Sequence, residues 1–382
     1  MNLQKTVTAI AIFITAIYVP YKIIDKHLNH PDKNWSFVLF GTKFIHGPLG
    51  VAIPEVQALQ LKAAKEEGYD GQRYAQLATD PFLTDPETLS KALPDPAYRA
   101  RRIGLPLTAY LFALGNKERA LWVYSISNIA FYYLFLGLFI FWKRPKTLKD
   151  NLLMCALFLT SGTLISVDRA LTDFAAAAFA VVGCVISQNR PKAGASLLSL
   201  ACLYKETTVL SLFALTPMNA LSEWRKSIQK IAIAVGPVFA WALYTKFVFR
   251  SELAGNGNFA IPFTEVIQKV STAIHNWGSS PGWSDQFELL SVLSLIAQST
   301  YLLLHRRWDS IYWRLGIGFV ILFFLLSNKV LVEQNAFMRV LLPITFSFNL
   351  TLHAEEKSNY RYWTYFILGN VGCLWALNTI FW

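Results

Sequence analysis

The residues best suited to chemistry gather in one short stretch of the chain. It reads Gly68-Tyr69-Asp70-Gly71-Gln72-Arg73-Tyr74 and then Leu77-Ala78-Thr79-Asp80-Pro81-Phe82. A sugar ring offers apolar C–H faces and many hydroxyl groups, so aromatic rings combined with carboxylate and amide side chains are what a sugar site requires. Asp70 could accept a proton from an attacking hydroxyl group. The alternative is a solvated turn, because aspartate followed by glycine is a common turn pair.

Further candidates are ionisable residues at or inside apolar segments. Asp168-Arg169 lies between two apolar segments, and Lys205-Glu206 interrupts a third. Such residues in a membrane usually face a water-filled cavity and serve a function. The alternative for Asp168-Arg169 is a hairpin turn with a helix cap and a local salt bridge. The alternative for Lys205-Glu206 is a salt bridge between the two residues. Arg339 lies at the start of another apolar run, and its alternative role is to anchor that run at the membrane interface.

The composition indicates the kind of element that must position these residues. The 382 residues are 54% hydrophobic and only 15% charged, whereas soluble domains carry roughly 25% charge. The apolar residues lie in repeated long runs, which excludes an ordinary soluble protein, a disordered chain, collagen and a coiled coil. We expect an all-α, polytopic transmembrane bundle over residues 1–382, with about 9–12 membrane helices of about 20 residues each, some broken or re-entrant.

The apolar runs predict the individual spans. They are Thr6–Ile23, Ala120–Trp142, Asn151–Val167, Ala170–Ser187, Ala195–Pro217, Ile231–Phe249, Phe287–Leu304, Ile311–Ser327, Val340–Leu352 and Tyr362–Trp382. Ala195–Pro217 is expected to enter and return on one side as two half-helices. The apolar residues 103–115 are too few to cross and predict an interfacial or re-entrant helix. Helical apolar spacing also appears within Pro54–Glu67.

The charges predict orientation and argue against a nucleic-acid partner. The net charge is +11, but Lys and Arg cluster in short connections between apolar segments, as in cytoplasmic loops. The outer face then receives the long loop 25–102, the Asp168-Arg169 junction, the Lys205-Glu206 break and the segment that ends at Arg339. This first loop is thus expected to be extracytoplasmic, and it holds ten of the 24 acidic residues. Loops of that length are usually functional, so we expect the active site there.

One motif resembles a known family. The run is Tyr69-Asp70-Gly71-Gln72-x-Tyr74-x-x-Leu77-Ala78-x-Asp80-Pro81-Phe82, followed by Tyr98-Arg99-x-x-Arg102-Ile103-x-x-Pro106-Leu107. It is similar to bacterial membrane proteins of cell-surface glycopolymer formation, in the GT-C superfamily of glycosyltransferases. The resemblance implies a multi-pass protein of the bacterial cytoplasmic membrane whose active site faces outside. It also implies a polyprenyl-phosphate sugar, a glycan or lipid acceptor and membrane lipids as partners.

The resemblance also implies a reaction and roles for the candidate residues. A hexosyl group would move in one inverting displacement, with Asp70 as the general base and Asp80 and Asp168 as further catalytic candidates. Arginine suits the leaving phosphate, and Arg99 and Arg102 are expected on one helical face, with snorkelling as the alternative. The expected lipid-phosphate ligands are Arg99, Arg102, Lys205 and Arg339. The expected substrate-binding residues are Tyr69, Gln72, Tyr74, Arg169 and Glu206.

Cofactors and competing functions complete the expectations. The six histidines show no ligand spacing, so no metal-binding residue is predicted. Members of the superfamily differ in their use of a divalent cation, so such an ion stays possible and no cofactor is certain. Two other functions remain open. They are a transporter or flippase of a lipid-linked saccharide, which would show paired interrupted helices, and a polymerase of surface polysaccharide.

Overall fold

The structure is a computed structural model, and it describes residues 3–41, 53–59, 68–216, 224–250, 257–279 and 283–375. In these ranges its regular elements are helices, and no β-strand is among them. The prediction of an all-α fold is therefore confirmed. An isolated bridge pairs the extended backbone of Phe259 with that of Leu326.

The first half of the chain combines long apolar helices with a group of short ones. In order they are α1 (Leu3–Phe13), the π-helical turn η1 (Ile14–Tyr18), α2 (Val19–Leu28), the 3-10 helix η2 (Lys33–Phe37), α4 (Pro54–Gln57), α5 (Gly71–Leu77), α6 (Pro86–Ala92), α7 (Pro96–Ala100), α8 (Gly104–Phe112), α9 (Lys117–Lys143), α10 (Leu148–Phe158), α11 (Ser161–Asp168) and α12 (Asp173–Ser187).

The second half continues with helices of mixed length. They are α13 (Pro191–Tyr204), the 3-10 helix η4 (Glu206–Leu215), α14 (Trp224–Phe249), α15 (Thr264–Ser279), α16 (Trp283–Leu304), α17 (Ile311–Leu325), α18 (Asn328–Leu331), α19 (Gln334–Val340), α20 (Leu342–Glu355), α21 (Tyr360–Asn370) and the 3-10 turn η6 (Val371–Leu374).

Four helical stretches are long and apolar enough to cross a membrane. They are Leu3–Leu28, Lys117–Lys143, Ser227–Phe249 and Gln286–Leu304, and α10 with α11 makes a fifth if that bent pair counts as one span. Several other predicted spans form helices of only 10–17 residues, such as α12 and α17. Within the described residues, the expectation of about 9–12 membrane helices of about 20 residues is thus met only in part.

The bend between α10 and α11 has a local cause. The two helices meet at 44°, where Leu159 and Thr160 interrupt the helical backbone. The Thr163 hydroxyl donates to the Leu157 carbonyl at 2.7 Å, which satisfies an acceptor that the break leaves without its usual partner. Thus the predicted span Asn151–Val167 is helical on both sides of a kink.

Two predicted helices differ from the structure, and one predicted break is present. Tyr362–Trp382 is not one continuous helix, because α21 ends at Asn370 where Gly372 packs directly on the Leu290 backbone. Residues 376–382 lie outside the described residues. In Pro54–Glu67 only α4 is helical, and residues 60–67 also lie outside. The predicted break at Lys205 is present, between α13 and η4.

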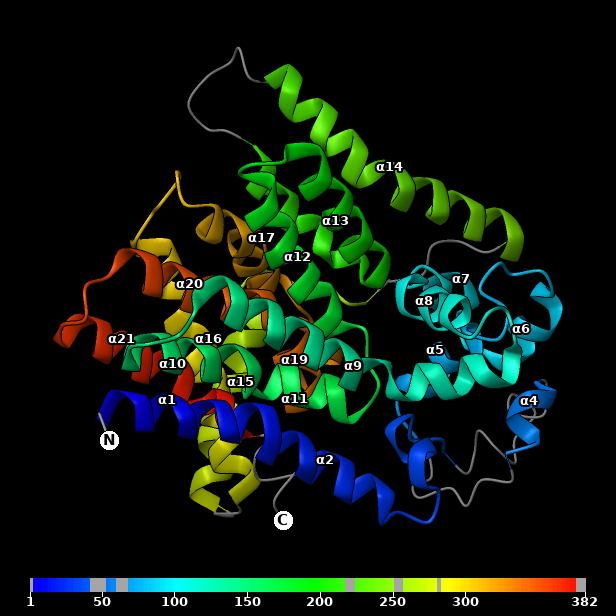
Figure 1. Ribbon diagram of the computed structural model, residues 1–382, viewed down its shortest axis with the longest axis horizontal. Coiled ribbons are helices and arrows are strands. Elements are labelled where there is room, and N and C mark those ends of the chain that lie inside the picture. Colours follow the sequence, from blue (N-terminus) through cyan, green and yellow to red (C-terminus); the bar gives the residue numbers. More distant parts are fainter. Residues whose placement is uncertain are drawn as a thin grey trace.

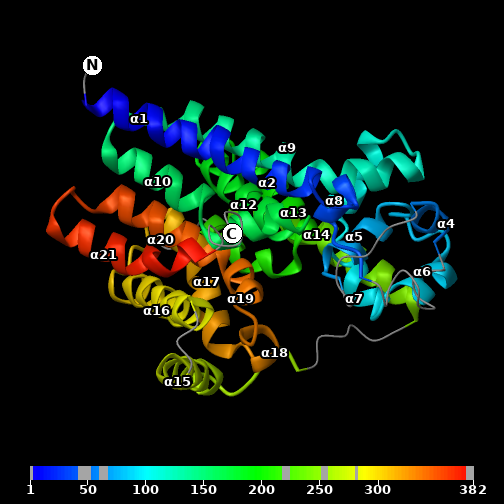
Figure 2. The ribbon, with the colours of Figure 1, turned by 90° about the horizontal axis from the view of Figure 1, so that it is seen from below.

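The elements divide into two regions that meet near α12. The short helices α4–α8 gather beside the N-terminal part of α9, at the right of Figure 1, whereas α16, α20 and α21 lie on the opposite side. Helices α1 and α2 run alongside α9 and α10 in both views (Figures 1 and 2). Helix α12 packs against α9, α11, α13, α17 and α20. A residue at the start of α12 can therefore meet residues from distant parts of the chain.

Candidate active site

Two glycines hold the Tyr69-Asp70 segment against the turn between α11 and α12. Gly68 has φ +65°, a conformation that other residues adopt only with strain. A Cβ atom on Gly71 would overlap the Arg169 carbonyl oxygen and would lie 3.2 Å from that of Val38. Helix α5 therefore begins with its backbone directly on this turn, and Asp70 immediately precedes it.

Asp70 is paired with three arginines. Its Oδ1 lies 3.1 Å from Arg73 Nη1 and 3.1 Å from Arg99 Nη1, and its Oδ2 lies 2.8 Å from Arg339 Nη2. Burial alone would raise the pKa of this carboxyl group, but the three guanidinium groups outweigh burial and hold the pKa well below its usual value. Asp70 is therefore ionised at neutral pH.

Arg339 extends the pairing to a second carboxylate. Its Nη1 donates to Asp173 Oδ2 at 3.2 Å, and Asp173 also forms an ion pair with Lys205. The Arg339 side chain is only 10% exposed and that of Asp173 only 2%. Asp173 was not among the predicted site residues. The sequence does contain an indication of its role, because Asp173 is an acidic residue at the start of an apolar run.

Arg102 and Glu206 form the adjoining pair. Arg102 donates from Nε and Nη2 to both Glu206 carboxylate oxygens, at 2.8 and 2.9 Å, and from Nη1 to the Tyr74 hydroxyl at 2.6 Å. Lys205 and Glu206 thus have different partners, and the mutual salt bridge considered for them is absent from the ion pairs of the described residues. The cause is the extended backbone of Lys205, at φ −154° and ψ 117°, because successive side chains of extended backbone point to opposite sides.

These residues form one charged cluster, which we call the Asp70–Asp173 cluster. It consists of Asp70, Arg73, Arg99, Arg102, Asp173, Lys205, Glu206 and Arg339. Three carboxylates face five cations, so the cluster has a surplus of two positive charges. Buried charges are costly without a partner. A surplus of cations in a poorly hydrated place therefore favours the binding of an anion.

A second group of charges lies around Asp168, at the end of α11. Its carboxylate is 3.0 Å from Lys26 Nζ, 2.9 Å from His27 Nε2 and 3.1 Å from Arg169 Nε. His27 Nδ1 lies 2.6 Å from the Ser36 hydroxyl. The sequence analysis did not single out Lys26, His27 or Ser36. Asp168 thus ties the end of the first long helix to α11.

A polar cavity lies between the two groups. Its volume is about 230 Å³, and its walls are Leu39, Gly68, Tyr69, Ile165, Asp168, Arg169 and Asn335. The Tyr69 ring faces Arg169 at 5.8 Å and Arg339 at 5.5 Å, measured from guanidinium carbon to ring centroid. Burial raises the pKa of Tyr69, so its phenol stays protonated and can donate a hydrogen bond.

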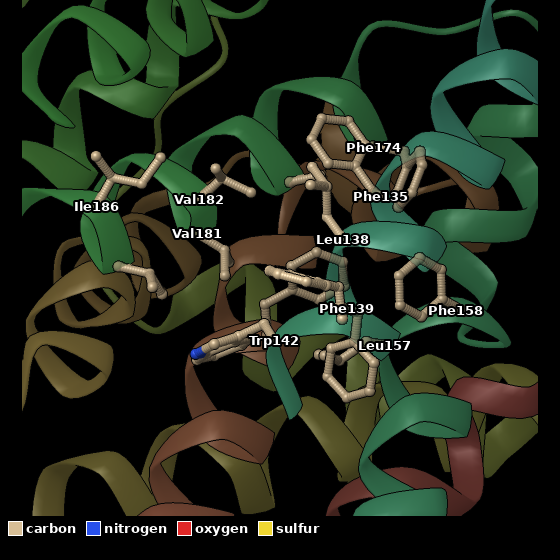
Figure 3. Close-up of a pocket in the computed structure, with 14 residues that line it drawn as sticks. Phe135, Leu138, Phe139, Trp142, Leu157, Phe158, Phe174, Val181, Val182 and Ile186 are labelled. Carbon is tan, nitrogen blue, oxygen red and sulfur yellow. The ribbon is translucent and has the colours of Figure 1, made fainter. Parts of the chain in front are cut away.

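An apolar groove begins one residue beyond Asp173. Its volume is about 200 Å³, and its walls come from α9, α10, α12 and α20. Figure 3 shows Phe135, Phe139 and Trp142 facing Phe174, Val182 and the rest of the α12 wall across this groove. From Phe174 to Ile186 the α12 wall extends about 18 Å, at 1.5 Å per residue. The groove therefore leads away from the Asp70–Asp173 cluster along α12.

The structure does not bring every predicted site residue into these groups. The Asp80 carboxylate accepts from the Thr84 hydroxyl and the Asp85 backbone N–H, each at 2.9 Å, and so holds the turn before α6. Gln72 Oε1 accepts from the Gly41 backbone N–H at 3.0 Å. Arg99 and Arg102 do not share one helical face, because α7 ends at Ala100. They still reach neighbouring acceptors, Asp70 and Tyr74.

Within the described ranges, no group of three or more His, Cys, Asp and Glu side chains is arranged to hold a metal ion. Comparisons with protein-family models, with curated proteins and with solved structures found no significant match. The argument for a function therefore depends on the geometry and charge of the clusters described above.

Proposed function

We propose that this protein is a membrane glycosyltransferase that moves a sugar from a polyprenyl-phosphate donor to a glycan or lipid acceptor. One observation carries the proposal. Arg339 joins Asp70 to Asp173 within a cluster that has two surplus positive charges and lies beside the start of an apolar groove. A lipid phosphate has the matching parts, an anionic head and a long apolar chain. The site would face the outside of a bacterial cytoplasmic membrane.

The phosphate would bind to arginines of the cluster. Arg99 and Arg339 both contact Asp70, and a guanidinium group can bind two phosphate oxygens at once. Arg102 is less suited, since Glu206, Tyr74 and Tyr98 already occupy its donors. Lys205 is held by Asp173 and would act mainly by adding positive charge.

The isoprenoid chain would lie in the apolar groove of Figure 3. The walls of this groove are aromatic and aliphatic side chains of α9, α10, α12 and α20. The apolar isoprenoid chain would therefore pack against apolar side chains. The groove begins at Phe174, next to Asp173. The phosphate and the first isoprene units would therefore sit on consecutive parts of α12.

Asp70 would act as the general base of a single displacement. The acceptor oxygen attacks the anomeric carbon, the bond from that carbon to the phosphate oxygen breaks, and the phosphate leaves with the electron pair. The acceptor proton passes to Asp70, and the anomeric centre inverts because there is one displacement. Three arginines make Asp70 a weak base. A bound phosphate that draws Arg99 and Arg339 away would raise the pKa of Asp70 and strengthen it as a base.

The test is sugar transfer from a panel of polyprenyl-phosphate sugars to membrane lipid extracts, with purified wild type beside Asp70→Asn. Loss of a general base should lower transfer by about 10²–10⁴-fold while donor binding persists. Glu87→Gln is the matched control, since the Glu87 carboxylate is exposed and pairs with Lys91. Equal transfer by wild type and Asp70→Asn would refute the role of Asp70. Movement of labelled lipid-linked saccharide across vesicles, without transfer, would favour the flippase.

A further inference from the structure

The polar cavity contains buried oxygen atoms that have no partner. Tyr69 Oη and Asn335 Oδ1 are both buried without a hydrogen bond among the described residues, and both side chains line the cavity. An unpaired buried polar atom costs about 1–3 kcal/mol, so such atoms usually have a partner. Both residues line the cavity, so a small rotation of either side chain would let one hydroxyl group of a ligand accept from Tyr69 and another donate to Asn335.

The same cavity presents the end of an arginine side chain. Arg169 contacts Asp168 through Nε at 3.1 Å, and within the described part of the chain its two terminal nitrogens have no ion-pair or hydrogen-bond partner. The two Asp168 oxygens are also held by Lys26 at 3.0 and 3.1 Å. Lys26 therefore offsets the charge of Asp168, and the positive charge of Arg169 remains available to a ligand.

Size and position limit the class of ligand. A volume of about 230 Å³ is many times the roughly 10–15 Å³ that one water molecule needs by the same measure, so one sugar ring has room to bind. The wall residue Tyr69 directly precedes Asp70, and its ring also faces Arg339. A ring bound here would thus lie on the far side of Tyr69 from the Asp70–Asp173 cluster.

We propose that this cavity binds a single sugar unit that carries an oxyanion, either a carboxylate or a phosphate. Arg169 pairs with the oxyanion, Tyr69 donates to one ring oxygen or hydroxyl group, and Asn335 accepts from another. The inference deepens the proposed function and rests on it, because the unit would belong to the glycan that the enzyme uses. It makes this protein selective for an acidic or phosphorylated sugar.

The experiment measures binding alone, by saturation-transfer NMR and calorimetry on the full-length purified protein. The probes are methyl glucuronide, glucose 6-phosphate, methyl glucoside and inorganic phosphate. We expect glucuronide or sugar phosphate to bind about tenfold more tightly than glucoside, as a charge-assisted pair requires. Arg169→Gln should remove this preference, and Asn335→Asp should weaken both anionic sugars by repulsion.

Lys91→Gln is the matched control, because it also removes one positive charge, from an exposed pair with Glu87 that does not line the cavity. It should keep the preference for the anionic sugar. Equal binding of glucuronide, sugar phosphate and glucoside would overturn the proposal. So would the same loss in Lys91→Gln as in Arg169→Gln, or binding of inorganic phosphate as tight as that of the sugar phosphate. Preferential binding without any sugar transfer would support the binding site and refute the glycosyltransferase. Transfer without preferential binding would support the glycosyltransferase and refute the binding site.

Discussion

Arg339 donates from Nη2 to Asp70 Oδ2 at 2.8 Å, across 269 positions of the chain. The same guanidinium group donates from Nη1 to Asp173 at 3.2 Å. One side chain thus fixes the distance between the carboxylate proposed as the base and the start of α12. Its removal would leave each of these two largely buried carboxylates with one counter-charge fewer.

Arg339→Gln should therefore destabilise the protein strongly. Breaking a buried ion pair from one side costs about 3–5 kcal/mol. Thermal unfolding in detergent, followed by circular dichroism, measures the change. The control is Lys91→Gln, whose pair with Glu87 is exposed and should have no measurable effect. Equal shifts in the two variants would show that the Arg339 contacts do not hold the cluster together.

The pH dependence should reveal how strongly the arginines hold Asp70. Its pKa in the folded protein lies below the unfolded value, which is about 3.9. The stability from this group is then fully present above about pH 4 and is lost as pH falls through the lower folded pKa. Between pH 5 and 8 we expect the difference in unfolding temperature between wild type and Asp70→Asn to be constant. A difference that changes within that window would mean that Asp70 titrates there, contrary to its three ion pairs.

Gly71→Ala should lower stability because a Cβ atom would overlap the Arg169 carbonyl. Overpacking of this kind costs about 1–3 kcal/mol, and the shift would also move Asp70 away from Arg339. The matched control is Gly137→Ala in α9, where no atom lies within 4 Å of the added Cβ. That change should be neutral or stabilise the helix by up to about 1 kcal/mol. Unfolding temperatures that rise in both variants would contradict the close approach at Gly71.

A large side chain in the apolar groove should weaken binding of long-chain donors. Val182 lines the groove, and Val182→Trp would fill part of it. Loss of about 1.4 kcal/mol of van der Waals contact with one isoprene unit would raise KM about tenfold. A short-chain donor should be affected less. Leu243→Trp is the control, since Leu243 is exposed on α14; a similar effect there would argue against the groove.

The sequence predicted local features far better than it predicted partners. Apolar length located the long helices, such as α9 within one turn of Ala120–Trp142, and the charges at Lys205 located a break. Local patterns cannot reveal that Arg102 pairs with Glu206, 104 positions away. Lys205 and Glu206 are neighbours in sequence, yet the extended backbone between two helices sends them to different partners.

Residues that sequence reasoning missed share one property. Asp173, Lys26 and His27 each lie at the end of a long or apolar helix, where charged residues commonly cap a helix or anchor it at an interface. The tertiary packing shows which charges these helix ends meet. Asp173 meets Lys205 where α12 packs against α13, and His27 meets Asp168 where α2 lies near α11. Asp80 is the opposite case, because its motif is prominent in the sequence but its carboxylate accepts two hydrogen bonds within the turn before α6.

The wide spacing of the cluster along the chain has a consequence for biosynthesis. Asp173 leaves the ribosome 166 residues before Arg339, a delay of roughly 10–30 s at about 5–20 residues per second. During that interval the Asp173 carboxylate lies at the start of an apolar helix, and its partner Arg339 has not yet been synthesised. Insertion of α12 should therefore depend on Lys205, which is made only 32 residues later, and truncated chains that end between Lys205 and Arg339 should be preferred targets of membrane quality control.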